Sequence, residues 1–289
     1  PREVWLAVDR RAGVPRLDVA ALRVVRMSGA ALVAGIDEHE VEGVTVRVTS
    51  PARTVVDCFR FRNKVGVDVA VDGLRDYRRL RVSCMPSFAA RWLLPRLGRF
   101  ITDQPNLDVE VQSSTRLADL KGGEADVGVR FGPGRYPGLS SRLLMKDWYY
   151  PVCSSEFIAR HQLASPAQLV SLPLLRSSAE LWQPWFKAAG VVIEEPQRGT
   201  VFDDSSLMLL AAASGQGVAL ARHTLAADDV ASGRLVRPFA TAVESPFSYF
   251  VVCRLADEHQ NEVAAFREWL LQEALSYCQP AGVLRPATS

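Results

Sequence analysis

The sequence predicts an α/β fold preceded by a small N-terminal α+β part. From Leu80 onward, short apolar or β-branched runs alternate with helix-length segments, as in parallel sheets covered by helices. Before about residue 79, alternating runs are broken by Gly and Pro, which indicates a small antiparallel sheet followed by helices. With 289 residues, 48% of them hydrophobic, the chain can bury one large core or two ordinary ones.

The N-terminal part opens with three candidate strands, VWLAVD, LRVVRMSG and GVTVRVTS. A helical stretch is expected from about Pro51 to Arg79, with Thr49 or Ser50 as its N-cap. Pro51 suits the first helical position because its missing N–H would be unpaired there anyway. Gly66 is expected to divide this stretch into two helices.

From Leu80 onward, strands and helices follow one another to a polar tail after Cys278. Strands are expected in LRVSC, LDVEVQSS, DVGVRFG, RLLMKDWYYPVCS, LPLLRS, GTVFD, GVALAR, LVRPF and SYFVVCR. Helices are expected in FAARWLLPRLGRF, EFIARH, WQPWFKAAG, the segment from Ser205, TLAADDVAS and EVAAFREWLLQEALSY. Pro95 predicts either a kink or a late start in the first of these helices.

Composition excludes several classes of protein. A net charge of +2 is too small to indicate nucleic-acid binding by itself. No apolar stretch reaches the roughly 18 residues of a membrane helix, and no signal pattern opens the chain, so we expect a cytoplasmic protein. The five cysteines lack C-x-x-C spacing, so no metal site or disulfide framework is expected. No cofactor is expected either, because the sequence has no motif that would hold one.

Two strand-to-helix turns are the strongest candidates for a binding site. In VFDDSSLMLLAAASGQG, Asp204 suits the N-cap, and the apolar run from Leu207 predicts a buried helix. Capping alone explains these residue types; alternatively, the helix N-terminus and the Ser205 hydroxyl bind a ligand at the carboxyl edge of the sheet. VSCMPSFAARWLLP places Ser87 at a similar turn, so the two could face each other across a cleft between two lobes.

Catalysis is not indicated. The sequence has no G-x-S-x-G, Walker or G-x-G-x-x-G motif, and its four histidines are isolated. Asp203 and Asp204 are adjacent, so on a strand they point to opposite faces and cannot share a proton. We therefore expect a binding protein rather than an enzyme.

Several motifs, in order and spacing, resemble the effector-binding domain of LysR-type transcriptional regulators, nearest to the glycine-cleavage-activator-like branch. They are LRVSCMPSFAARWLLPRLGRF, GEADVGVRFGPGRYPGL, FDDSSLMLLAAASGQGVALAR, LVRPF and SPFSYFVVC. The resemblance implies a regulator with two Rossmann-like lobes, as in periplasmic binding proteins, around a small-molecule effector. It places the domain at residues 80–278, with lobe one at 80–152 plus 254–277, lobe two at 153–253 and a tail at 279–289.

The same resemblance implies an effector site in the cleft. The family's cleft positions fall on Ser87, Ser114, Thr115, Phe131, Gly132, Asp204 and Ser205, with Trp148 and Phe247 as weaker additions that are as readily core residues. Two helix N-termini suit a carboxylate and Asp204 suits an ammonium group, so we expect an amino acid or peptide fragment. The family further implies a homo-oligomer, either a dimer or a tetramer.

Residues 1–79 instead resemble the C-terminal domain of AbiEi-type antitoxins, chiefly in TVVDCFRFRNKVG. Both families carry a winged helix that residues 1–79 do not match, so DNA binding is expected only if such a module precedes Pro1. An alternative is an antitoxin or partner-binding protein acting on a toxin through residues 1–79. A two-lobed solute-binding protein is disfavoured because no export signal is present.

Overall fold

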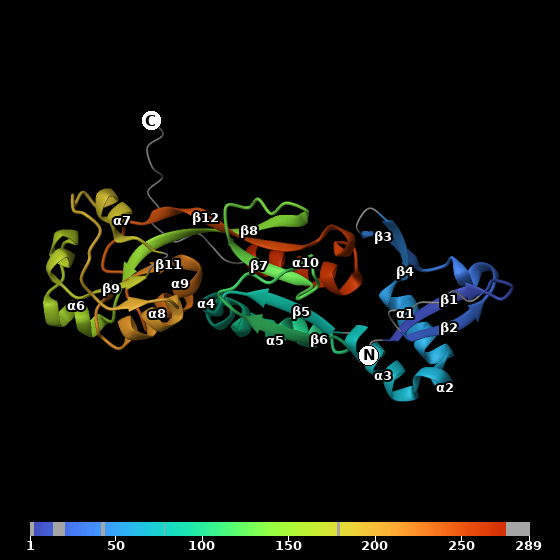
Figure 1. The fold of residues 1–289 in the computed structure, drawn as a ribbon. Coiled ribbons are helices and arrows are strands. Elements are labelled where there is room, and N and C mark those ends of the chain that lie inside the picture. Colours follow the sequence, from blue (N-terminus) through green and yellow to red (C-terminus); the bar gives the residue numbers. More distant parts are fainter. Residues whose placement is uncertain (1–2, 14–20, 42–43, 78, 178–179, 276–289) are drawn as a thin grey trace. The chain divides into compact units, whose positions relative to one another are not determined.

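The computed structural model describes residues 3–13, 21–41, 44–77, 79–177 and 180–275. The chain forms two compact units, Pro1–Arg78 and Arg79–Ser289 (Figure 1). No helix in the described ranges is long and apolar enough to cross a bilayer.

The first unit contains two small sheets. Strand β1 (Glu3–Asp9) pairs in parallel with β2 (Ala21–Met27), and β3 (Ile36–Val41) forms an antiparallel hairpin with β4 (Val44–Thr49). A short 3-10 turn, η1 (Gly29–Leu32), lies between the two sheets in sequence. The expected antiparallel pairing is therefore right for the hairpin and wrong for β1 and β2, because alternation marks a strand but not its direction.

Three helices follow in the described part of this unit: α1 (Pro51–Arg60), α2 (Arg62–Val65) and α3 (Val67–Tyr77). The Ser50 hydroxyl caps α1 by accepting the Arg53 amide at 3.3 Å. Gly66, at φ +96°, separates α2 from α3 as predicted. A further break at Phe61, where φ and ψ are −105° and 21°, separates α1 from α2.

The second unit is built on one mixed sheet of eight strands, in the order β10-β9-β11-β8-β12-β7-β5-β6. The long strands β8 (Leu139–Val152) and β12 (Val243–Arg254) lie in its middle and run antiparallel to each other. On one side lie β7 (Val127–Gly132), β5 (Arg79–Cys84) and β6 (Asp108–Ser113), and on the other β11 (Val218–Arg222), β9 (Leu174–Ser177) and β10 (Val201–Phe202). Figure 1 shows β8 and β12 running between these two ends.

Each end of the sheet carries its own helices, which we call lobe one and lobe two. Lobe one holds β5, β6 and β7, together with the helices α4 (Pro86–Phe88), η2 (Ala89–Leu93), α5 (Leu94–Asp103) and α10 (Asn261–Leu275). Lobe two holds β9, β10 and β11, together with the helices α6 (Ser155–His161), η3 (Pro166–Ser171), α7 (Trp182–Ala188), α8 (Ser205–Ala213) and α9 (His223–Ala231). The short turn η4 (Leu255–Asp257) precedes α10. Each lobe has a separate core: Trp92, Phe100 and Phe266 pack in lobe one, and Trp182 and Trp185 in lobe two.

The helix that contains Pro95 begins early and is distorted before the proline. It starts at Pro86, passes through a π-helical turn over Ala89–Leu93 and continues as α5. A proline lacks an N–H and its ring clashes with the carbonyl four residues earlier, so the widened turn accommodates Pro95 without ending the helix.

Two expected features of lobe two differ in the structure. The LVRPF segment is not a strand in the described chain; it contributes one antiparallel bridge, Val236 to Cys153. Helix α8 is not buried all round, because Leu207 and Leu210 are 53% and 54% exposed whereas Leu209 is fully buried. A uniformly apolar helix has no polar face to mark the side that faces solvent.

Candidate functional site

Arg222 joins the two strand-to-helix turns at the centre of the second unit. It ends β11 and is only 2% exposed. Its Nη2 donates to the Ser205 hydroxyl of lobe two at 3.2 Å and, at a longer 3.4 Å, to the Ser87 hydroxyl of lobe one. The structure therefore brings together the two serines that the sequence placed at facing helix N-termini.

Three further side chains surround the same guanidinium. Its Nη1 donates to the Tyr249 hydroxyl at 2.9 Å, and its Cζ lies 4.7 Å from the centre of the Phe131 ring. Its Nε forms an ion pair with Glu180 Oε1 at 2.8 Å, but the direction of the N–H does not allow a hydrogen bond between these two atoms. Burial alone would lower the pKa of Arg222, but the surrounding Tyr249, Glu180 and Asp147 raise it overall, so it stays charged.

Asp147, on the crossing strand β8, adds a second buried carboxylate. It is 0% exposed, and its Oδ1 accepts the backbone amides of Trp148 at 2.9 Å and Thr224 at 3.0 Å. The Thr224 amide lies in the first turn of α9, so Asp147 caps this helix from a neighbouring strand. Burial raises the pKa of Asp147 to about 6 despite the opposing effect of Arg222.

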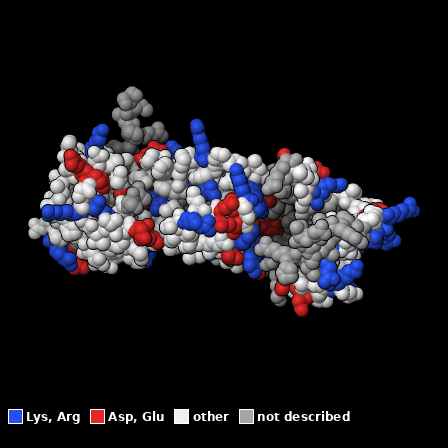
Figure 2. Space-filling model, viewed as in Figure 1, with Lys and Arg blue, Asp and Glu red and all other residues white. Residues whose placement is uncertain are grey.

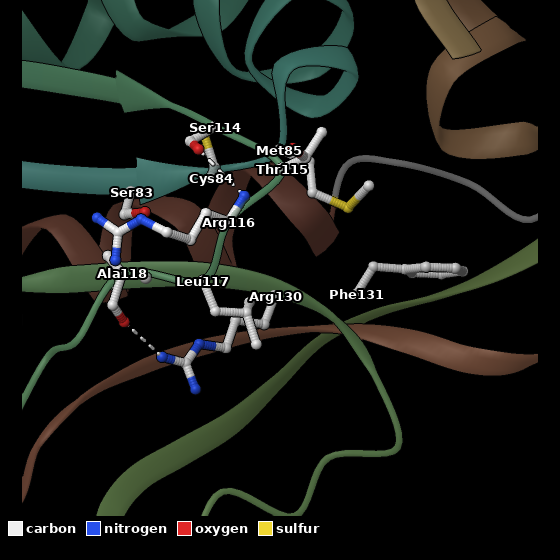
Figure 3. A pocket seen from close by; sticks show the side chains of 11 residues that line it. Ser83, Cys84, Met85, Ser114, Thr115, Arg116, Leu117, Ala118, Arg130 and Phe131 are labelled. Atoms are coloured by element: carbon white, nitrogen blue, oxygen red, sulfur yellow. Dashed lines mark hydrogen bonds between the residues drawn. The ribbon is translucent and has the colours of Figure 1, made fainter. Parts of the chain in front are cut away.

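A pocket of about 190 Å³ opens at the carboxyl ends of β5, β6 and β7 (Figure 3). Three of the predicted site residues, Ser114, Thr115 and Phe131, line it. Arg130 also lines it, and its Nη2 donates to the Ala118 carbonyl at 3.1 Å. Since Phe131 also stacks on Arg222, it connects the pocket to the buried arginine. The Cys84 thiol in the lining is inert, because burial raises its pKa to about 12.

The remaining predicted residues fall into different environments. Asp204 is the N-cap of α8, and its Oδ1 accepts both the Ser206 amide at 2.7 Å and the Ser206 hydroxyl at 2.6 Å. Trp148 packs in the core of lobe two, which agrees with its alternative as a core residue. Gly132 is buried at the end of β7. Phe247 is 43% exposed, and its ring meets the Phe131 ring edge to face, with the two ring centres 5.9 Å apart.

Ion pairs link the lobes beside this centre. Arg91, in the π-helical turn of lobe one, reaches Asp229 of α9 at 2.5 Å and donates to the Ser206 carbonyl at 3.0 Å. Arg96 of α5 pairs with Asp228 at 3.1 Å. The first pair is shielded from solvent and the second is half exposed, so Arg91 contributes more of the interlobe attraction.

Sequence reasoning missed Arg222, Glu180 and Asp147. A detectable signal existed for two of them, because Arg222 is the sole charge in the apolar run GVALAR and Asp147 lies inside the long strand RLLMKDWYYPVCS. Glu180 lies in a loop, SSAEL, where a glutamate is unremarkable and only the fold reveals its burial.

The site is suited to binding. Among the described residues no cluster of three or more His, Cys, Asp or Glu could hold a metal ion. Figure 2 shows positive and negative side chains interspersed over the face that it draws, which fits the net charge of +2.

Residues 75–275 match the family model of the LysR substrate binding domain. The glycine cleavage system transcriptional activator of Escherichia coli strain K12 is 36% identical over 197 residues, which cover 68% of this chain and 65% of the relative. The HTH-type transcriptional activator AmpR of Pseudomonas aeruginosa is 38% identical over 197 residues, covering 68% and 66%. The chain thus spans about two thirds of the length of these relatives.

Solved structures show the same similarity. The effector domain of AmpR of Pseudomonas aeruginosa is 37% identical, with a TM-score of 0.61 over 69% of this chain and 96% of that chain. The AmpR effector-binding domain of Citrobacter freundii is 27% identical, with a TM-score of 0.61 over 69% and 99%. These comparisons give no support to the antitoxin resemblance of residues 1–79 or to a toxin partner.

Proposed function

The chain belongs to the LysR substrate-binding domain family, and on that premise we propose that it senses a small-molecule effector held between its two lobes. It is a LysR-type effector-binding domain, and the relatives named above are transcriptional regulators rather than enzymes. The proposed limits of the domain are residues 80–278, after a separate N-terminal domain over residues 1–79.

One observation carries the proposal: the hydroxyls of Ser87 and Ser205, from different lobes, share one nitrogen of Arg222. Each serine lies at the start of a helix that follows a strand, where backbone amides and the helix dipole favour polar ligands. The pocket lined by Ser114, Thr115 and Phe131 provides space next to this centre.

The effector would act by changing the angle between the lobes. A ligand shifts such an equilibrium only as far as it binds one arrangement better than the other. The Arg91–Asp229 and Arg96–Asp228 pairs stabilise the present arrangement, so a ligand that favours another must compensate for their loss. In a regulator, the change of angle alters how subunits of a homo-oligomer are positioned.

We propose an amino acid or a peptide fragment as the effector. A carboxylate suits the helix N-termini at Ser87 and Ser205, and buried carboxylates nearby suit an ammonium group. A cytoplasmic location, a dimer or tetramer, and DNA binding through a separate module belong to the same proposal. No specific observation favours an antitoxin role.

The test is a thermal-shift screen of amino acids, peptides and other metabolites against the full chain. Ser87→Leu and Ser205→Leu would each remove one of the hydroxyls that Arg222 joins and add bulk at that point. Thr102→Leu and Ser214→Leu are matched controls, because both are exposed hydroxyl residues on or just after helices of lobe one and lobe two.

A ligand of the shared site is expected to raise the thermal unfolding midpoint of wild type and of both control variants, but not that of Ser87→Leu or Ser205→Leu. Ligands that stabilise all five proteins equally would contradict the proposal.

A further inference from the structure

Glu180 lies at the carboxyl edge of the lobe-two sheet, where ligands bind open α/β sheets. It follows β9, which runs parallel to both β10 and β11. Ser205 follows β10 and Arg222 ends β11, so all three side chains come from the same edge. Glu180 is 2% exposed and therefore fully desolvated.

The two oxygens of Glu180 differ in their surroundings. Oε1 accepts the Ser205 hydroxyl at 3.2 Å and faces Arg222 Nε at 2.8 Å. Oε2 is buried and has no hydrogen-bond partner among the described residues. An ionised carboxylate can accept several hydrogen bonds, and a buried oxygen without one is destabilising, so this atom needs a donor from elsewhere.

The charges around Arg222 indicate what kind of donor fits. One buried guanidinium faces two buried carboxylates, Glu180 and Asp147, and the Asp147 Oδ2 likewise has no partner in the described ranges. Tyr149 and Tyr249 stay neutral because burial raises the pKa of each. Two buried acidic side chains therefore share one buried basic side chain, which favours a cationic guest over an anionic one.

Asp204, which the sequence suggested for an ammonium group, is a poorer candidate. Its Oδ1 is already taken by the amide and hydroxyl of Ser206, which it binds as the cap of α8. Glu180 is more buried, its Oε2 is enclosed without a hydrogen-bond partner among the described residues, and its Oε1 contacts Arg222 directly.

We propose that Glu180 Oε2 accepts a hydrogen bond from the ammonium group of the effector, which is therefore a primary amine such as an amino acid or a peptide N-terminus. This inference rests on the proposed function and adds the chemical group that is recognised and the residue that recognises it. An N-acylated analogue would be rejected, because it has lost its charge and carries extra bulk at the buried oxygen.

Matched probe pairs test the inference on the full chain by thermal shift and calorimetry. Glycine, L-alanine and L-alanyl-L-alanine are each compared with the N-acetyl derivative, and methylammonium chloride is compared with sodium chloride at equal ionic strength. Wild type is expected to bind at least one free amine at least tenfold more tightly than its acetylated partner.

Glu180→Gln removes the charge and is expected to abolish that preference. Glu156→Gln is the matched control, since Glu156 is an exposed glutamate of lobe two. If Glu180→Gln does not fold because Arg222 loses its partner, the double variant Glu180→Gln with Arg222→Gln removes both charges and is expected to fold without binding amines.

The outcomes separate this inference from the proposed function. If an acetylated or anionic compound binds in a manner that Ser87→Leu and Ser205→Leu abolish and Glu180→Gln does not, the shared site stands and the amine inference falls. Equal binding of both members of every pair, or a crystal structure with an amine probe that shows only an ordered water at Oε2, also overturns it. If neither the metabolite screen nor the amine probes give a ligand, the proposed function and the amine inference are both overturned.

Discussion

Asp147→Asn is expected to change how the stability of the protein depends on pH. In the folded chain burial raises the pKa of Asp147 from 3.8 to about 6. A difference of one between the folded and unfolded pKa values corresponds to about 1.4 kcal/mol, so ionising this carboxyl in the folded state costs about 3 kcal/mol relative to the unfolded chain. The folded state holds the proton more tightly, so this stabilisation is present at low pH and is lost as pH rises through 6.

The assay is urea unfolding of the second unit, followed by tryptophan fluorescence, for wild type and Asp147→Asn between pH 4 and pH 8. The free energy of unfolding of wild type minus that of the variant should fall by about 2–3 kcal/mol across the range, with roughly half of the fall between pH 5 and pH 7.5. Asp103→Asn, at an exposed aspartate, controls for the general effect of removing one charge. A difference that is flat, or that rises with pH, would refute the reasoning.

Three further outcomes are expected. Leu209→Ala should lower the free energy of unfolding by about 2–5 kcal/mol in urea titrations, whereas Leu210→Ala on the exposed side of the same helix should cost less than about 1 kcal/mol. Gly98→Ala should raise the thermal midpoint, because an added Cβ meets no atom within 4 Å and alanine favours the helix by about 1 kcal/mol. Iodoacetamide at pH 8, read by peptide mass spectrometry, should label the half-buried Cys58 well before Cys84, whose thiol burial keeps protonated.

The sequence predicted local structure correctly where a residue type is strongly favoured at one structural position, such as a helix N-cap. Ser50 before Pro51 and Asp204 before Ser205 both cap helices, as their short acceptor side chains predict. The alternation of strands and helices after Leu80 likewise predicted the α/β fold, and the resemblance to LysR-type regulators implied its two lobes. The convergence of Ser87 and Ser205 was expected because each lies where a helix follows a strand, and the two turns were predicted to face each other from separate lobes.

What the sequence did not reveal depends on long-range packing. Strand direction, as in β1 and β2, is set by the tertiary path and not by alternation. The LVRPF run has strand-like residues but makes one bridge, since a propensity is realised only where a partner strand is present. Glu180 and Arg222 are 42 positions apart, and no local pattern shows that a loop glutamate will be buried against an arginine at a strand end.

The shared donor at position 222 also restricts which changes the chain can tolerate. The Arg222 Nη2 carries two hydrogens and donates to the Ser87 and Ser205 hydroxyls together, so removing one hydroxyl leaves one of these hydrogen bonds and removing both leaves this nitrogen without a hydroxyl acceptor. The losses of unfolding free energy caused by the two single substitutions should therefore not add up to the loss caused by the double substitution. The effect of a substitution at one serine therefore depends on the residue at the other, so we expect these two positions, 118 residues apart, to change together during evolution.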